Sequence, residues 1–107
     1  MLYRTEVIGR LGKDAVTSIV DGGSTVINFS LCYSKKYKHK DGTPDELKIW
    51  MECSIWKKQG ESTEIAAALT KGRQIWCEGQ MTADIFIDKK DQPQPVLKLR
   101  ISNIDLL

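Results

Sequence analysis

The stretch Leu47–Lys58 constrains the fold more than any other part of the chain, because its apolar and polar side chains alternate. A period of two is the pattern of a β-strand that turns one face to a core. The apolar phase consists of Leu47, Ile49, Met51, Cys53 and Ile55. The opposite phase consists of Lys48, Trp50, Glu52, Ser54, Trp56 and Lys58. A water-facing strand ordinarily carries charges and hydroxyls, and this one sets two tryptophans among lysines.

These two tryptophans indicate a ligand surface. At a rise of roughly 3.3 Å per residue, Trp50 and Trp56 would lie about 20 Å apart on one face. Flat rings beside ammonium groups suit single-stranded nucleic acid, whose bases stack and whose backbone is anionic. The strand alone leaves open the alternative that the rings pack against a second sheet or another subunit.

The length and charge limit the class of protein. A chain of 107 residues can bury about two thirds of its unfolded surface, so we expect residues 1–107 to form a single domain. The net charge of +2 is only mildly basic, and a site for a polyanion must therefore come from local clustering. The start, Met1–Glu6, lacks the apolar segment of a secretory signal, and no apolar run approaches membrane-spanning length.

The cysteines Cys32, Cys53 and Cys77 lie far apart and form no C-x-x-C pair. This spacing predicts reduced, buried thiols in a cytoplasmic protein, with neither disulfides nor zinc. The sequence also lacks a clustered carboxylate pair and a phosphate loop, so we expect no enzyme, no cofactor and no metal site.

Four more strands and one helix are predicted. Tyr3–Leu11 is interrupted at Gly9, and a glycine inside a strand pattern predicts a bulge or bend that lets a sheet curl into a barrel. A short continuation at Val16–Val20 follows, and the other strands are Val26–Tyr33, Ile75–Ile87 and Val96–Leu107. The helix is expected within Gly60–Lys71, with Ser62 as its N-cap and Gly72 as its stop.

The stretch Lys35–Glu46 has no apolar periodicity and contains turn residues, which predicts a long exposed loop. Its first half carries only positive charge and holds Tyr37, so a flexible flap over nucleic acid is one interpretation and a merely solvated loop is the other. His39, the only histidine, has no obvious cysteine or carboxylate partner, and we expect no metal or catalytic role for it.

This order of elements predicts an all-β protein, a five-stranded OB-fold barrel with one α-helix between strands 3 and 4. The middle strands and connecting loops of such barrels bind oligonucleotides or oligosaccharides. The fold alone selects neither ligand.

Several pieces of the chain occur together in one family. They are Val7–Asp14 with the pattern G-x-L-G-x-D, Gly22-Gly23, Val26–Leu31, Trp50–Lys58, Lys71-Gly72, and Cys77–Met81 with E-G-Q. In this order and over nearly the whole chain, they resemble the bacterial single-stranded DNA-binding proteins. The chain looks like a short form without the acidic C-terminal tail, either naturally short or excised from a longer protein.

The resemblance implies sequence-independent binding of single-stranded DNA in replication, recombination and repair. Trp50, Trp56 and Phe86 match the base-stacking aromatics of the family, and Lys58 and Lys71 match phosphate-contacting positions. The full set of residues expected to bind nucleic acid is Trp50, Trp56, Phe86, Tyr37, Lys35, Lys36, Lys38, Lys48, Lys58 and Lys71. A homotetramer, or less readily a dimer, is also implied, with Trp76 and Met51 at the subunit interface.

Two departures from the family pattern predict weaker binding. Glu52 stands where relatives often place a basic residue, and Thr82, Asp84 and Ile85 replace a basic stretch beside Phe86. Two other functions therefore stay open. One is a dimeric module similar to primosomal replication protein N. The other is an OB-fold protein-interaction domain with both strand tryptophans in its interface.

Overall fold

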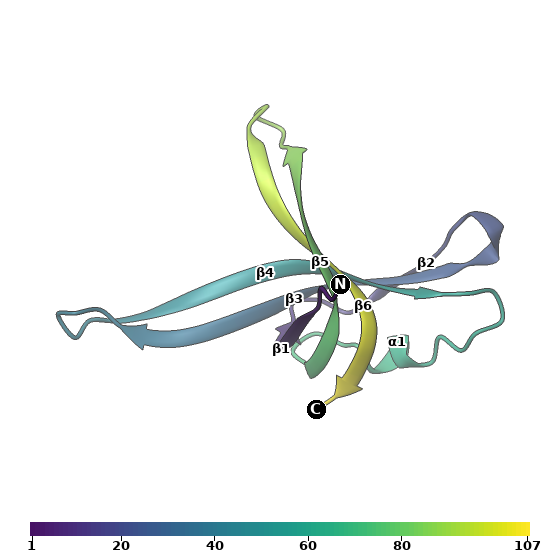
Figure 1. The fold of residues 1–107 in the computed structure, drawn as a ribbon, viewed down its shortest axis with the longest axis horizontal. Coiled ribbons are helices and arrows are strands. Elements are labelled where there is room, and N and C mark those ends of the chain that lie inside the picture. The colour runs from purple at the N-terminus through teal and green to yellow at the C-terminus, as the bar shows by residue number, and fades with distance from the viewer.

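The computed structural model describes residues 1–107, and Figure 1 shows a β-barrel from which long hairpins project. The elements, in chain order, are β1 (Thr5–Leu11), β2 (Val16–Ile19), η1 (Asp21–Gly23), β3 (Thr25–Lys38), β4 (Pro44–Lys57), α1 (Ile65–Ala68), β5 (Gln74–Ile87) and β6 (Pro93–Leu106).

Five of the six strands close into a barrel. The sheet has the order β1-β5-β6-β4-β3-β2, and a further pairing of β1 with β3 joins its two sides. Only the β4–β6 pair is parallel. This arrangement is consistent with the predicted OB fold. Helix α1 lies after β4 and before β5, so it falls between strands 3 and 4 only if β1 and β2 are counted as one strand.

The core lies inside the barrel and takes every second side chain of the strands that form it, as the alternation predicted. Leu47, expected on the core phase of its strand, is instead 46% exposed, because β4 begins outside the core. Its fully buried members include Ile27, Leu31, Leu69, Ile75, Leu99, Cys53 and Cys77. Met51, expected at a subunit interface, is 4% exposed and belongs to this core. That expectation was wrong, because Met51 occupies the inward phase of β4 and presents almost no surface to a second chain.

Strand β1 closes the barrel by changing its partner. Residues 5–10 pair with β5, and Arg10 and Leu11 pair with β3. The predicted interruption at Gly9 does not occur, since β1 runs through it without a break. The glycine instead allows the backbones of β1 and β3 to come close together, because a Cβ built on Gly9 would lie 2.6 Å from the carbonyl oxygen of Cys32.

The predicted loop at Lys35–Glu46 is largely strand. The β3–β4 ladder extends from the pair Thr25–Lys57 to the pair Lys38–Pro44, and the turn occupies only residues 39–43. Backbone hydrogen bonding continues here without an apolar face, which is why periodicity could not reveal it. We call residues 33–49 the β3–β4 arm; it extends to the left in Figure 1, and the β5–β6 hairpin extends upward.

The predicted helix is reduced to the single turn α1, and Ser62 is not its N-cap. The Ser62 hydroxyl accepts a hydrogen bond from the Glu64 amide at 3.3 Å, before the helix starts. Leu69 then leaves helical geometry, is buried in the core, and its carbonyl accepts the Ala15 amide at 2.9 Å. Burial of Leu69 therefore ends the helix early. The structure has no helix with the length and hydropathy of a membrane span.

Candidate nucleic-acid interface

Three predicted aromatics lie on one continuous surface of the barrel. Their strands adjoin in the order β5-β6-β4, and the exposed fractions of Trp50, Trp56 and Phe86 are 54%, 46% and 50%. Leu31, Met51, Cys53 and Leu99 point inward, so the residues that alternate with them point outward. We call this surface the outer face; it comprises Cys32, Trp50, Glu52, Ser54, Trp56, Gln80, Thr82, Asp84, Phe86, Lys98 and Arg100.

Trp50 forms one wall of a cleft of about 460 Å³. The cations that line the same cleft come from three segments and are Arg10, Lys48 and Lys71. The Trp50 ring rests against Gly12, where a built Cβ would lie 2.6 Å from the ring carbon Cζ3. A half-exposed ring beside three cations can stack a base while the cations contact its phosphates.

Lys71 is brought to this cleft by backbone hydrogen bonds. The Asp14 carboxylate accepts the Lys71 amide at 2.8 Å, and the Gly72 amide donates to the Leu11 carbonyl at 2.8 Å. Arg10 Nη1 donates to the Gly72 carbonyl at 3.1 Å. The G-x-L-G-x-D motif and the Lys71-Gly72 motif, far apart in the sequence, are thus hydrogen-bonded to each other.

Trp56 has a cation over its ring. The guanidinium carbon of Arg100 lies 5.1 Å from the ring centroid, within the range of a cation–π interaction. Both residues line a hollow of about 240 Å³ together with Lys58. The Lys58 amide donates to Glu61 Oε1 at 2.6 Å, which fixes the chain where β4 ends.

Strand β6 supplies basic residues that the sequence pattern did not indicate. The parallel register places Lys98 beside Glu52 and Arg100 beside Ser54, and Lys98 also lies opposite Thr82 on β5. Lys98 thus stands next to Glu52 and Thr82, two of the positions where relatives carry a basic residue and this chain does not. The alternation Lys98-Leu99-Arg100-Ile101 could have indicated the common phase of the two cations, but not which strand lies beside them.

The two acids of the outer face have partners within the chain. Glu52 accepts the Ser30 hydroxyl with its two carboxylate oxygens at 3.2 and 3.4 Å. Asp84 Oδ2 lies 3.3 Å from Lys98 Nζ, and its Oδ1 accepts the Ile85 amide at 2.8 Å. The Ile85 amide first, and Lys98 second, lower the pKa of Asp84, so the carboxyl is charged at neutral pH.

The structure does not bring all the predicted arm residues onto the outer face. Strand alternation puts Lys36, Lys38 and Lys48 on the phase of Trp50, and Lys35 and Tyr37 on the opposite phase.

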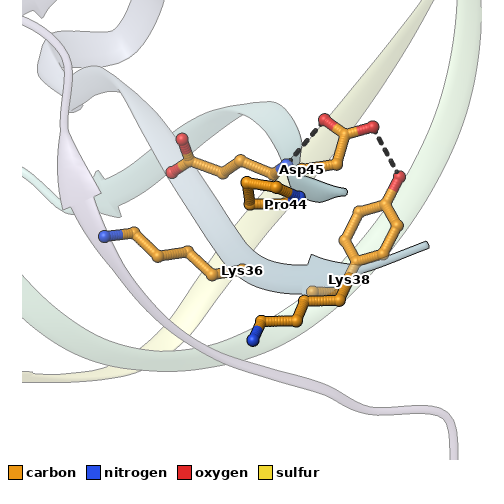
Figure 2. Close-up of a pocket in the computed structure, with 6 residues that line it drawn as sticks. Lys36, Lys38, Pro44 and Asp45 are labelled. Carbon is orange, nitrogen blue, oxygen red and sulfur yellow. Dashed lines mark hydrogen bonds between the residues drawn. The ribbon is translucent and has the colours of Figure 1, made fainter. Parts of the chain in front are cut away.

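The predicted loop aromatic is held by an acid on the facing strand. The Tyr37 hydroxyl donates to Asp45 Oδ2 at 3.0 Å, and His39 Nε2 lies 2.8 Å from the same oxygen. His39 therefore has a carboxylate partner that the sequence did not reveal. A hollow of about 550 Å³ opens at this point of the β3–β4 arm, where Figure 2 shows Lys36 and Lys38 with Pro44 and Asp45.

Substituting Asp45 by asparagine should lower the pKa of Tyr37. The pKa of this phenol is raised mainly by its hydrogen bond to the Asp45 carboxylate, and an amide carries no charge to oppose ionisation. Tyrosinate absorbance followed against pH would show one tyrosine titrating earlier in Asp45→Asn. Asp41→Asn is the matched control, since Asp41 is bonded to Thr43 instead. An unchanged titration of Asp45→Asn would mean that the bond is not made in solution.

Trp76 lies on a different wall of the barrel. It pairs with Ile8 across β1 and β5, is half-buried, and donates its indole N–H to Glu6 Oε1 at 2.6 Å.

The cysteines divide between core and surface. Burial raises the pKa of the Cys53 thiol, and raises that of Cys77 to about 11. Cys32 differs from the expectation of a buried thiol, because it is only half-buried and lines the Trp50 cleft. No group of three or more His, Cys, Asp or Glu side chains is placed to hold a metal ion.

Comparison with known proteins gives a consistent result. The model of the Single-strand binding protein family matches residues 2–107. The "Single-stranded DNA-binding protein" of Aquifex aeolicus is 25% identical over 107 residues, which are 100% of this chain and 71% of that protein. "Single-stranded DNA-binding protein 1" of Chlorobaculum tepidum is 31% identical over 90 residues, 83% of this chain and 54% of that protein. The Xylella fastidiosa "Single-stranded DNA-binding protein" is 29% identical, with 94% of this chain and 60% of that protein covered.

One solved structure shows the same fold. It is described as a Plasmodium falciparum SSB complex with ssDNA, and it matches with a TM-score of 0.78 at 21% identity over 100% of this chain and 96% of that one. The likeness supports the barrel described above. The chain spans little more than half the length of several of the curated relatives that it matches.

Proposed function

The chain belongs to the single-strand binding protein family, and from this premise we propose that it binds single-stranded DNA without regard to base sequence. The observation that carries the proposal is the outer face, where Trp50, Trp56 and Phe86 stand half-exposed and cations lie beside the two tryptophans. Every base offers a flat face to an aromatic ring, and stacking typically contributes about 1–3 kcal/mol per base. Such contacts read no base edge, so they favour all sequences alike.

Phosphate contacts supply the second part of the proposed mechanism. Arg10, Lys48 and Lys71 line the Trp50 cleft, and Lys58 and Arg100 line the hollow at Trp56. Each phosphate that they neutralise releases a condensed counterion, which makes the affinity depend on salt. Lys36 and Lys38 extend the positive surface along the β3–β4 arm. Tyr37 and Lys35 would meet the DNA only where the strand wraps around this arm.

The biological setting belongs to the same proposal. A protein of this kind protects and organises single strands in the cytoplasm during replication, recombination and repair, and is not an enzyme. Residues 1–107 would act as one binding domain and assemble as a homotetramer. The half-buried Trp76 on the β1–β5 wall offers a position for a subunit contact next to Ile8, which is exposed and also lines the Trp50 cleft.

Titration of tryptophan fluorescence with oligothymidine tests the proposal. We expect strong quenching at low salt and an affinity that falls as salt rises. If the five cations Arg10, Lys48, Lys58, Lys71 and Arg100 each neutralise one phosphate, the logarithm of the binding constant should change with a slope of about −3.5 against the logarithm of salt concentration. A duplex of the same length serves as the control and should quench far less. Absence of quenching at low salt would contradict DNA binding and favour a protein-interaction domain.

A further inference from the structure

Two cations of strand β6 lie at the centre of the outer face, and they are held in different ways. We propose that Asp84 restrains Lys98: it holds the Lys98 ammonium in the free protein, and a DNA phosphate must take its place when the strand binds. Arg100, in contrast, is already fixed over the Trp56 ring. This inference rests on the proposed function, and it concerns which residue limits the strength of binding at the proposed site.

The position of Lys98 follows from the sheet order. Strand β6 lies between β4, which carries Trp50 and Trp56, and β5, which carries Phe86. Neighbouring strands are about 4.8 Å apart, so a DNA strand that passes from the tryptophans to Phe86 must cross β6. Lys98 has Glu52 on one side and Thr82 on the other. It therefore occupies the middle of that path.

The partner of Lys98 is fixed by the backbone. Asp84 pairs with Val96 across β5 and β6, which makes it the diagonal neighbour of Lys98. The Ile85 amide holds one carboxylate oxygen at 2.8 Å, and the other oxygen lies 3.3 Å from Lys98 Nζ. Glu52, the other acid nearby, is bonded to the Ser30 hydroxyl. Asp84 is therefore the acid that competes with a phosphate for Lys98.

Replacing Asp84 by a DNA phosphate as the partner of Lys98 costs little free energy. The Lys98 and Asp84 side chains are 56% and 61% exposed, and ion pairs in water at a protein surface are weak. A phosphate brought close by the neighbouring aromatic rings can displace Asp84. The displaced carboxylate then stays near the phosphate and repels it, so the charge of Asp84 opposes binding both before and after the exchange.

The variant Asp84→Asn tests this inference, because an amide oxygen can still accept the Ile85 amide. At about 0.15 M salt, we expect Asp84→Asn to bind oligothymidine about three-fold more tightly than the wild type. Lys98→Ala should bind more weakly and reduce the size of the salt slope by about 0.7, the contribution of one phosphate on a single strand. In the double variant, most of the gain from Asp84→Asn should disappear.

Asp91→Asn is the matched control, since Asp91 lies in the turn of the same hairpin and its carboxylate makes no ion pair. An equal gain from Asp91→Asn, or an undiminished gain from Asp84→Asn in the Lys98→Ala background, would overturn the inference, because Asp84 would then act only through net charge. A wild-type protein that does not bind at low salt would instead overturn the proposed function. Normal wild-type binding with no gain in Asp84→Asn would overturn the inference alone.

Discussion

Replacing Trp50 by alanine is expected to weaken binding of oligothymidine by about 5- to 150-fold, the range that corresponds to the loss of one stacked base. The Trp50 ring is 54% exposed and forms the wall of the cleft lined by Arg10, Lys48 and Lys71. Its removal therefore takes away the stacking platform and leaves the three cations in place. The salt slope should stay near the wild-type value while the affinity drops at every salt concentration.

The measurement for Trp50→Ala is the fluorescence anisotropy of a dye-labelled oligothymidine, because the substitution removes one of the intrinsic fluorophores. Trp50→Phe is the matched control and should recover part of the affinity through its smaller ring. Thermal unfolding should change little, since half of the ring surface is already in water. Unchanged affinity in Trp50→Ala would contradict base stacking at this position, and a loss of folding would mean that the ring acts as a packing residue against Gly12.

Substituting Gly79 by alanine is expected to lower the free energy of unfolding by about 3 kcal/mol or more, which is a large part of the 5–15 kcal/mol typical of a domain. A Cβ at this position would lie 1.9 Å from the Arg100 carbonyl oxygen and 2.9 Å from the Ile101 Cα. Both are backbone atoms, so no change of rotamer relieves the overlap. The β5–β6 register shifts between Glu78 and Gly79 at this point.

Denaturant unfolding of Gly79→Ala would measure this loss. Gly22→Ala is a useful comparison, because a Cβ there meets nothing within 4 Å and only the positive φ of 82° opposes it. That strain is worth about 1–2 kcal/mol. Equal stability of Gly79→Ala and the wild type would show that the two strands can separate at the bulge. In the folded fraction, the displaced Arg100 should also weaken contact with the Trp56 ring.

Local alternation predicted much of the site. The period of two placed Trp50 and Trp56 together on the outward phase of β4, and it placed Met51, Cys53 and Ile55 on the inward phase. These predictions are confirmed, because an inward or outward direction depends only on the position of a residue along its own strand.

Contacts between distant segments were not predictable in the same way. The cations Lys98 and Arg100 reach the outer face because β6 pairs in parallel with β4, and such a pairing leaves no local signal in either strand. The bond between His39 and Asp45 depends on where the β3–β4 turn falls, and the absence of apolar residues hid that turn. The length of the helix was overestimated. Helix propensity correctly predicts helix over Ala66–Ala68, but it contains no information on the burial of Leu69 in the core, which ends the helix.

The projecting parts of the β3–β4 and β5–β6 hairpins have regular hydrogen-bond ladders but pack against no apolar layer. Side chains from Ser34 to Lys48 and from Thr82 to Ile87 are all exposed, so no apolar layer links these segments to the barrel. Regular hydrogen bonding does not by itself confer resistance to local opening, since amide protection follows buried contacts as well. The barrel therefore has buried contacts that resist local opening, and the two hairpins lack them. A nucleic acid that lies across both hairpins must restrict their motion. The conformational entropy lost in this way lowers its affinity.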